Sequence, residues 1–251
     1  MPITVTPVAP FGAEIGGVDL AAPLPEQDAA ALRGLLAEHQ VLVFRDQDID
    51  TAQQVAFAES LGPTLRFASV VDPDAGPSKS HEVRGSTTGW HIDASPFYEP
   101  PVATMLRAVV VPPEGGDTLF ASGSLAFDEL PDDLRTAIEG RHATHGGATP
   151  DRPLVAHSLR KTHPVSGRPV LYINLADWAD AVVVGLGREE SDALVDRLRA
   201  IYLDPSRVAR VQWRPGTVTL WDNRSVQHSG TADYGDQDRL MVRVCIAGLH
   251  G

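Results

Sequence analysis

Residues 239–246 read Arg-Leu-Met-Val-Arg-Val-Cys-Ile, and this stretch decides which fold can be built around it. In an extended strand alternate residues share a face. One face carries both arginines, Arg239 and Arg243, together with Met241 and Cys245, whereas the other face is wholly apolar. The sequence therefore predicts a strand that is covered on both sides, with two cations on one of its faces.

The two arginines of this strand are close enough to serve one site. Arg239 and Arg243 are four residues apart, or about 13 Å along a strand that rises about 3.3 Å per residue. Their long side chains can therefore reach a single polar pocket. Because arginine is almost never fully buried without a partner, the pair requires anions nearby. Either acidic side chains from elsewhere in the chain or a bound anionic ligand would meet that requirement.

Further strands are predicted where β-branched or aromatic residues run between clusters of Pro, Gly and Asp. These segments are 41–44, 102–111, 170–173, 208–213 and 217–221, and the strand described above is predicted over 240–246. Helices are predicted at 26–40, at 51–61 with Asp50 as the N-cap, at 131–140 and at 189–202. This succession of strands is typical of an antiparallel barrel or sandwich with helices packed outside it.

Composition limits the class of protein. With 251 residues, 43% of them hydrophobic and 22% charged, the chain can bury one large core, so we expect a single domain over residues 1–251, although length alone allows two smaller ones. The net charge of −12 argues against a nucleic-acid surface, which needs clustered Lys and Arg. Cys245 has no disulfide partner, and neither a signal peptide nor an apolar run of about 20 residues is present. We therefore expect a cytoplasmic protein with no membrane or nucleic-acid partner.

A possible metal site begins at Trp90-His91-Ile92-Asp93. His91 and Asp93 are two residues apart, so an extended strand or the edge between a loop and a strand would direct both to one side. Two histidines and one carboxylate can bind Fe(II) on one face of its octahedron and leave the other positions open. The second histidine would be His228, in Gln227-His228. Only a fold that pairs distant strands could assemble such a site.

These histidines also allow a coincidental pairing or a different metal. The chain has nine histidines, so a His-x-Asp pair can occur by chance, and zinc uses the same residue types. Nearby anion-binding arginines favour an open ferrous site, and residues 221–224, shortly before His228, could supply supporting hydrogen bonds to it. His142 and His145 lie in a Gly-containing loop and His163 precedes a proline, so we expect structural roles for these three.

Short motifs occur in a specific order through nearly the whole chain. They are Gly12-Ala13-Glu14-Ile15-Gly16-Gly17-Val18-Asp19-Leu20, Val43-Phe44-Arg45, Trp90-His91-Ile92-Asp93, Pro100-Pro101, Gly115-Gly116-Asp117-Thr118-Leu119-Phe120, Thr162-His163-Pro164, Gly167-Arg168, Leu171-Tyr172-Ile173-Asn174, Trp221-Asp222-Asn223-Arg224, Gln227-His228 and Arg239-Leu240-Met241-Val242-Arg243. Together they resemble the taurine dioxygenase-like (TauD/TfdA) family of non-haem iron, 2-oxoglutarate-dependent dioxygenases.

The resemblance implies a mostly β protein with flanking helices around a double-stranded β-helix (jelly-roll, cupin-like) core. The implied iron ligands, and hence the catalytic residues, are His91, Asp93 and His228. Thr118 and Arg239 are implied to bind the distal carboxylate of 2-oxoglutarate. The implied reaction uses O2 to hydroxylate a small, anionic organic substrate and releases succinate and CO2.

The substrate is the least determined part of this expectation. Arg243 is implied to lie near 2-oxoglutarate and to contact an anionic group of the substrate, since its planar charged fork suits carboxylate, sulfonate or phosphate. Thr87 and Phe97 are further candidate substrate contacts. Taurine-oxidising relatives have Asn in place of Thr87 and His in the loop that here spans 65–70. We therefore expect a substrate other than taurine.

Two other functions stay open. The reaction of a family member can end in desaturation, cyclisation or oxidative cleavage, as in secondary-metabolite tailoring. A jelly-roll protein could also bind metal and ligand without turnover, although the iron triad together with Thr118 and Arg239 favours catalysis.

The Pro- and Gly-rich loops at 71–79 and 143–159 are predicted to border the pocket. The resemblance also implies a homo-oligomer, without indicating its interface.

Overall fold

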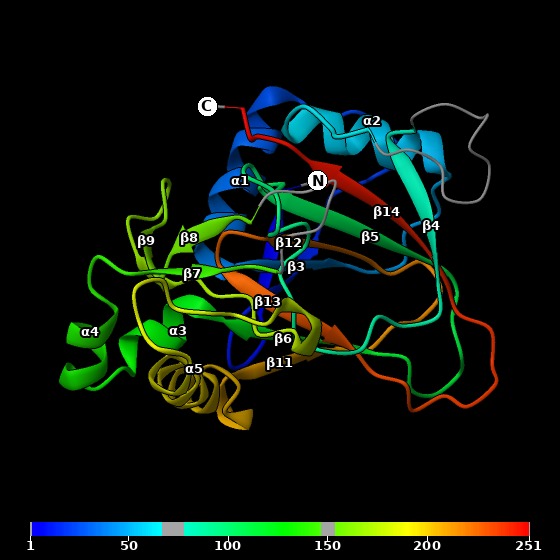
Figure 1. Cartoon of the computed structure of the whole chain (residues 1–251). Helices are drawn as coiled ribbons and strands as arrows, with labels where there is room; N and C mark the ends of the chain where they lie inside the picture. The colour runs from blue at the N-terminus through cyan, green and yellow to red at the C-terminus, as the bar shows by residue number, and fades with distance from the viewer. Residues whose placement is uncertain (1, 67–77, 147–153, 251) are drawn as a thin grey trace.

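The structure is a computed structural model that describes residues 2–66, 78–146 and 154–250. Its centre is formed by two β-sheets, seen between the helices in Figure 1. The seven-stranded sheet has the order β1 (Thr4–Pro7), β2 (Ala13–Gly16), β3 (Val41–Phe44), β12 (Val218–Asp222), β5 (Ala103–Val110), β14 (Leu240–Ile246) and β4 (Ser80–Arg84). The three-stranded sheet has the order β11 (Val208–Val211), β6 (Thr118–Ser122) and β13 (Val226–Gly230). Strands from distant parts of the chain are thus neighbours in both sheets.

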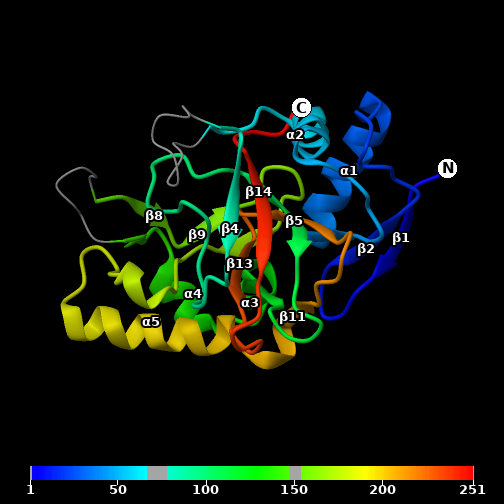
Figure 2. The same ribbon diagram turned by 90° about the vertical axis from the view of Figure 1, so that its right-hand side faces the viewer.

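Helices lie outside these sheets on two opposite sides (Figures 1 and 2). α1 (Glu26–His39) and α2 (Thr51–Leu61) pack beside the seven-stranded sheet, and α3 (Gly123–Asp128), α4 (Asp132–Ile138) and α5 (Arg188–Tyr202) lie at the other end. Two small sheets pair β7 (His142–Thr144) with β8 (Ala156–Ser158) and β9 (Arg160–Thr162) with β10 (Pro169–Leu171). The prediction of a mostly β protein with flanking helices is confirmed.

The strand β14 has both faces buried, as its sequence predicts. Met241 packs with Phe120 and Trp221 in the core between the two large sheets. Val244 and Ile246 instead belong to the core that the seven-stranded sheet shares with α1 and α2. Because successive side chains of a strand point to opposite faces, one short segment joins both cores.

Local signals in the sequence locate the ends of the predicted elements well. β3, α2 and β14 have the predicted bounds, and the ends of the other predicted segments shift by only one or two residues. At the start of α2 the Asp50 carboxylate accepts from the Gln53 N–H at 2.8 Å, while the Gln53 side chain accepts from the Asp50 N–H at 2.9 Å. This reciprocal capping box satisfies two backbone donors that the helix cannot.

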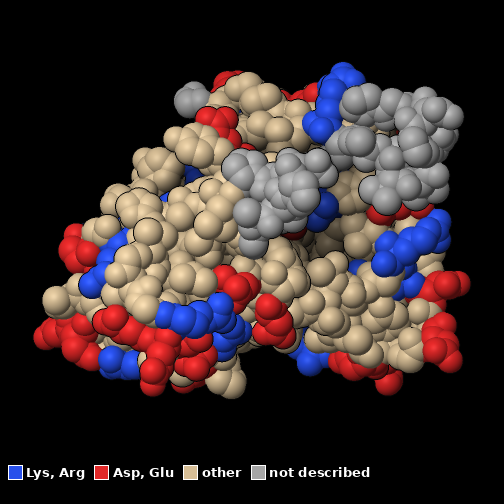
Figure 3. All heavy atoms as spheres, viewed as in Figure 1, with Lys and Arg blue, Asp and Glu red and all other residues tan. Residues whose placement is uncertain are grey.

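Charged side chains of both signs are interspersed on the surface, most densely over the lower edge in Figure 3, where α4 and α5 lie. Arg197 of α5 pairs there with Asp133 of α4 at 2.7 Å, and Arg188 pairs with Asp192 one turn along α5 at 2.8 Å. Exposed pairs of this kind stabilise a protein by less than about 1 kcal/mol each. Among the described helices, none combines the length and apolar character that crossing a bilayer requires.

Candidate active site

His91 and His228 are brought together by a short piece of β-pairing. The backbone N–H of each histidine donates to the carbonyl of the other, at 3.0 and 2.9 Å, and the two rings lie 4.2 Å apart between centroids. His228 belongs to β13, where it lies opposite Phe120 of β6. The metal motif therefore reaches its distant partner by adding one pair of hydrogen bonds to the edge of the three-stranded sheet.

Asp93 lies in a turn, so the prediction of an extended strand through this motif is wrong beyond His91. The backbone turns at Ala94, whose φ is +51°, and Phe97 N–H donates to the Ala94 carbonyl at 2.9 Å. The alternative expectation, an edge between a loop and a strand, describes this geometry correctly.

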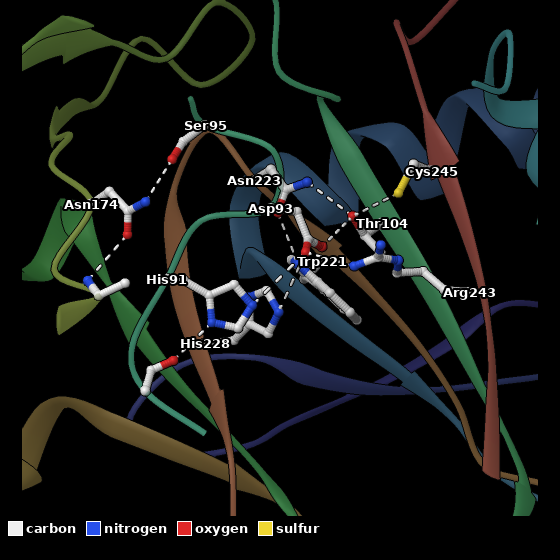
Figure 4. Close-up of polar contacts among 12 residues, drawn as sticks. His91, Asp93, Ser95, Thr104, Asn174, Trp221, Asn223, His228, Arg243 and Cys245 are labelled. Carbon is white, nitrogen blue, oxygen red and sulfur yellow. Dashed lines mark hydrogen bonds and ion pairs between the residues drawn. The ribbon is translucent and has the colours of Figure 1, made fainter. Parts of the chain in front are cut away.

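One donor atom from each of His91, Asp93 and His228 lies within 4.8 Å of the others, and all three residues are buried. The Nε2 atoms of both histidines are 3.9 Å from Asp93 Oδ1 (Figure 4). Adjacent ligands that are each about 2.1 Å from an ion are about 3.0 Å apart. Each histidine therefore needs to approach Asp93 by about 1 Å, and no pair of donors needs to close by more than about 2 Å, for the three to hold one ion.

The protonation of these groups also suits a metal. Burial alone would raise the pKa of Asp93, but His228, Arg243 and His91 outweigh it and lower this pKa to about 2. Burial and the neighbouring His91 lower the pKa of His228 to about 3. The carboxylate is thus ionised and His228 neutral at pH 7, as metal ligands must be. His91 Nδ1 lies 2.8 Å from the Gly89 carbonyl, so this nitrogen carries the proton and leaves the Nε2 lone pair for a metal.

A chain of buried hydrogen bonds holds the other oxygen of Asp93. Thr104 of β5 donates its hydroxyl proton to Asp93 Oδ2 at 2.8 Å, and Asn223 Nδ2 donates to the Thr104 hydroxyl at 2.9 Å. Asn223 Oδ1 in turn accepts from Trp221 Nε1 at 2.9 Å (Figure 4). Since Oδ2 is occupied in this way, Oδ1 is the oxygen directed at the two histidines. The prediction that residues 221–224 support the site with hydrogen bonds is confirmed, although they support Asp93 and not His228.

A cavity beside the three donors is lined by Arg243 of β14 and by Arg239, the residue just before this strand. Its wall includes His91, His228, Thr118, Arg239 and Arg243. Arg243 Nη1 contacts Asp93 Oδ1 at 3.0 Å, the oxygen that also faces the two histidines. The prediction that the two arginines reach one pocket is confirmed. Of the two expected sources of negative charge, the acidic partner is present, because Arg243 contacts Asp93, and an anionic ligand beside the arginines stays a prediction.

Arg239 and Thr118 are held in place by groups around the same cavity. Arg239 donates from Nε to the Gly116 carbonyl at 2.9 Å and from Nη1 to the Gly85 carbonyl at 2.7 Å. The Thr118 hydroxyl accepts from Trp213 Nε1 at 3.0 Å, so its own proton is available to a ligand. A fixed guanidinium beside a hydroxyl donor is a suitable site for a carboxylate.

Some predicted site residues lie elsewhere or cannot be placed. Thr87 lines the cavity, whereas Phe97 is 55% exposed and is not among the described residues of its wall. His163 binds Asp222 at 3.0 Å, as expected of a structural histidine. Residues 67–77, which include most of two predicted loops, and residues 147–153 of a third lie outside the described parts of the chain. Whether those loops border the pocket stays a prediction.

Two supporting residues of the site were missed from the sequence, Thr104 and Trp213. Thr104 and Arg107 are the two polar residues of the otherwise apolar strand β5, and Thr104 is wholly buried. A buried hydroxyl in such a strand needs a hydrogen-bond partner, and this requirement was the available signal. Trp213 gave no comparable signal, because an aromatic residue at the end of a strand is usually part of the core.

Comparison with known proteins gives a consistent result over almost the whole chain. Residues 4–245 match the family described as "Taurine catabolism dioxygenase TauD, TfdA family". The (S)-phenoxypropionate/alpha-ketoglutarate-dioxygenase of Sphingobium herbicidovorans is 32% identical over 96% of this chain and 93% of its own length. An alkylsulfatase of Acinetobacter baylyi is 30% identical over 95% of this chain and 82% of its own length.

Solved structures agree with this result. A taurine dioxygenase from Burkholderia xenovorans superposes with a TM-score of 0.85 at 32% identity, covering 97% of this chain and 90% of its own. The crystal structure of AAD-2 in complex with Mn(II) and N-oxalylglycine superposes with a TM-score of 0.86 at 28% identity, covering 100% and 99%. The predicted double-stranded β-helix core is therefore confirmed.

Proposed function

The chain belongs to the TauD/TfdA family of Fe(II)- and 2-oxoglutarate-dependent dioxygenases, and from this premise we propose the residues that carry its reaction. His91, Asp93 and His228 hold Fe(II), and Arg239 with Thr118 binds the distal carboxylate of 2-oxoglutarate. The observation that carries this proposal is the convergence of three buried donors within 4.8 Å, beside a cavity that both other residues line. The whole of residues 1–251 acts as one catalytic domain.

When bound, the iron supplies the redox chemistry that couples O2 and 2-oxoglutarate to hydroxylation of the substrate, with release of succinate and CO2. The protein supplies orientation. The backbone carbonyls of Gly116 and Gly85 fix the Arg239 guanidinium, and Trp213 turns the Thr118 hydroxyl so that it donates to a bound carboxylate. Because these donors are preorganised, little further ordering is needed when the co-substrate binds.

The substrate of this chain is a small organic anion. Arg243 lines the cavity next to Asp93, and with its side chain 28% exposed it can present a permanent charge to a ligand that enters from solvent. A phenoxypropionate and an alkyl sulfate ester, which the names of two relatives suggest as substrates, each join an apolar body to one anionic group. We propose that Arg243 binds that group, with Thr87 beside it and Phe97 at the entrance. A substrate other than taurine stays a prediction.

Succinate formation tests the substrate class. The purified protein, with Fe(II), 2-oxoglutarate and O2, is assayed with alkyl sulfates, aryloxypropionates and alkyl sulfonates. For each anion a neutral alcohol or amide of the same shape is assayed in parallel as a control. At least one anion should raise succinate formation above its substrate-free rate, and the neutral analogue should not. Arg243→Met should raise the KM for that anion by about tenfold or more, since a charge-assisted hydrogen bond is lost. Equal stimulation by the neutral analogue, or no stimulation by any anion, would contradict the proposal.

The same assay distinguishes the alternatives. A tailoring enzyme releases succinate but yields a desaturated, cyclised or cleaved product, which mass spectrometry identifies. A protein that binds ligands without turnover releases no succinate. A cytoplasmic location and a homo-oligomeric state stay predictions.

A further inference from the structure

A second cavity, here called the Lys161 cavity, lies between the β9–β10 hairpin and the turn after β12. Its volume is about 180 Å³, and its wall includes Pro100, Pro101, Lys161, Pro164, Tyr172 and Arg224. None of its wall residues is shared with the cavity beside His91 and Arg239. It is therefore separate from the site to which the proposed function assigns iron, 2-oxoglutarate and substrate.

Lys161 brings a positive charge into this cavity. Its ammonium nitrogen lies 3.5 Å from the centroid of the Tyr172 ring, a cation–π contact. In the described ranges of the chain no carboxylate forms an ion pair with it. Burial lowers the pKa of Lys161 to about 8, so most of this lysine remains charged at pH 7.

The carboxylate that borders the cavity wall is already engaged. Asp222 accepts from Arg224 Nε at 2.8 Å and from His163 Nε2 at 3.0 Å. The backbone N–H of Ser166 donates to His163 Nδ1 at 3.1 Å, so the His163 proton is on Nε2 and the ring is neutral. Arg224 therefore balances the charge of Asp222, and no carboxylate among the described residues of the wall balances the charge of Lys161.

The rest of the wall limits the kind of ligand. Three prolines and Val170 also line the cavity and give its wall an apolar part. A volume of about 180 Å³ is below the roughly 300–1,000 Å³ of a typical ligand pocket, so an occupant is a small molecule. We propose that the Lys161 cavity binds a small organic anion, with its acidic group on the Lys161 ammonium and its apolar body against the prolines.

Benzoate and its neutral analogue benzamide are suitable probes. Binding is measured by isothermal titration calorimetry to the protein saturated with Mn(II) and 2-oxoglutarate without O2, so that the metal and co-substrate positions of the other cavity are occupied, and the lysine variants separate the Lys161 cavity from the substrate position beside Arg243. The wild-type protein should bind benzoate, and Lys161→Met should bind it about tenfold or more weakly, because a charge-assisted contact is removed. Lys161→Arg should retain binding, and benzamide should bind poorly to every variant. Equal benzoate affinity in the wild type and Lys161→Met, or no binding to the wild type, would overturn the proposal.

The sequence offers a matched control, because Lys79 and Lys161 are its only lysines. Lys79 pairs with Glu59 on the surface, away from the cavity wall, so Lys79→Met should leave benzoate binding unchanged. In the wild-type protein, the acetylation rates of the two lysines also show whether benzoate occupies the Lys161 cavity. Benzoate should slow the acetylation of Lys161 by acetic anhydride relative to that of Lys79, as read by peptide mass spectrometry. If the ratio of the two acetylation rates does not change, benzoate binds elsewhere and the assignment to Lys161 is wrong.

Discussion

The hydroxyl of Thr104 should determine how tightly the site holds a metal. It donates to Asp93 Oδ2 at 2.8 Å and accepts from Asn223 Nδ2 at 2.9 Å, with all three residues buried. Thr104→Val keeps the shape of the side chain but leaves one carboxylate oxygen and one amide without their partner. A buried hydrogen bond to a charged group contributes about 1.5–3 kcal/mol. Removing a hydrogen-bond partner from a metal ligand typically weakens metal binding by about 10–100-fold.

Mn(II) affinity measures this effect without turnover, because electron paramagnetic resonance reports the free ion directly. We expect Thr104→Val to bind Mn(II) about 10–100-fold more weakly than the wild type. Thr104→Ser is the control, since it loses a methyl group but keeps the hydroxyl, and it should bind within a few-fold of the wild type. Urea unfolding without metal shows whether each variant folds. If a folded Thr104→Val binds Mn(II) as tightly as Thr104→Ser, the hydroxyl does not orient Asp93 and the reasoning fails.

Four further predictions follow from individual contacts. Asp93→Ala should abolish Fe(II)-dependent succinate formation, and unchanged turnover would refute its role as a ligand. Arg239→Ala should raise the KM for 2-oxoglutarate by about tenfold or more with a smaller change in kcat, whereas an unchanged KM would place the co-substrate elsewhere. Burial lowers the pKa of His145 to about 3 in the folded protein, whereas the unfolded chain protonates this histidine near its ordinary pKa of about 6.5. As the pH falls below about 6.5, the unfolded state is therefore stabilised by this protonation. The free energy of unfolding decreases by about 1.4 kcal/mol per pH unit. His145→Phe should remove that part of the slope in urea unfolding at pH 5 to 6.5, and an unchanged slope would disprove it. Asp50→Ala should lower the free energy of unfolding by about 1 kcal/mol without altering any KM, and full stability in urea would show that the capping box contributes little.

The sequence predicted the elements with strong local signals. α2 has its N-cap at Asp50, and β14 has its alternating faces, so both segments have the predicted bounds. The residue types of the metal site were also readable, because His91, Asp93 and His228 stand in family motifs. Their convergence could not be derived locally, since it depends on pairing between His91 and a strand far along the chain.

Polar strands account for much of what local patterns missed. β13 reads Val-Gln-His-Ser-Gly and has no apolar alternation, yet its first four residues are buried. Its side chains are satisfied by specific partners, as when Gln227 accepts from the Leu175 N–H at 2.9 Å. A strand whose polar side chains have buried partners looks like a loop to any rule based on hydrophobic periodicity. Thr104 was missed for a related reason, because its partner Asp93 lies on a different element.

The central claim is that His91, Asp93 and His228 share one ferrous ion while Arg239 and Thr118 hold 2-oxoglutarate. A crystal structure of the protein prepared without O2, with Fe(II) and 2-oxoglutarate, tests it most directly. We expect the iron at about 2.0–2.2 Å from Nε2 of both histidines and from an Asp93 carboxylate oxygen. The distal carboxylate should contact the Arg239 guanidinium and the Thr118 hydroxyl. Iron bound by other side chains, or 2-oxoglutarate bound away from Arg239, would contradict the account.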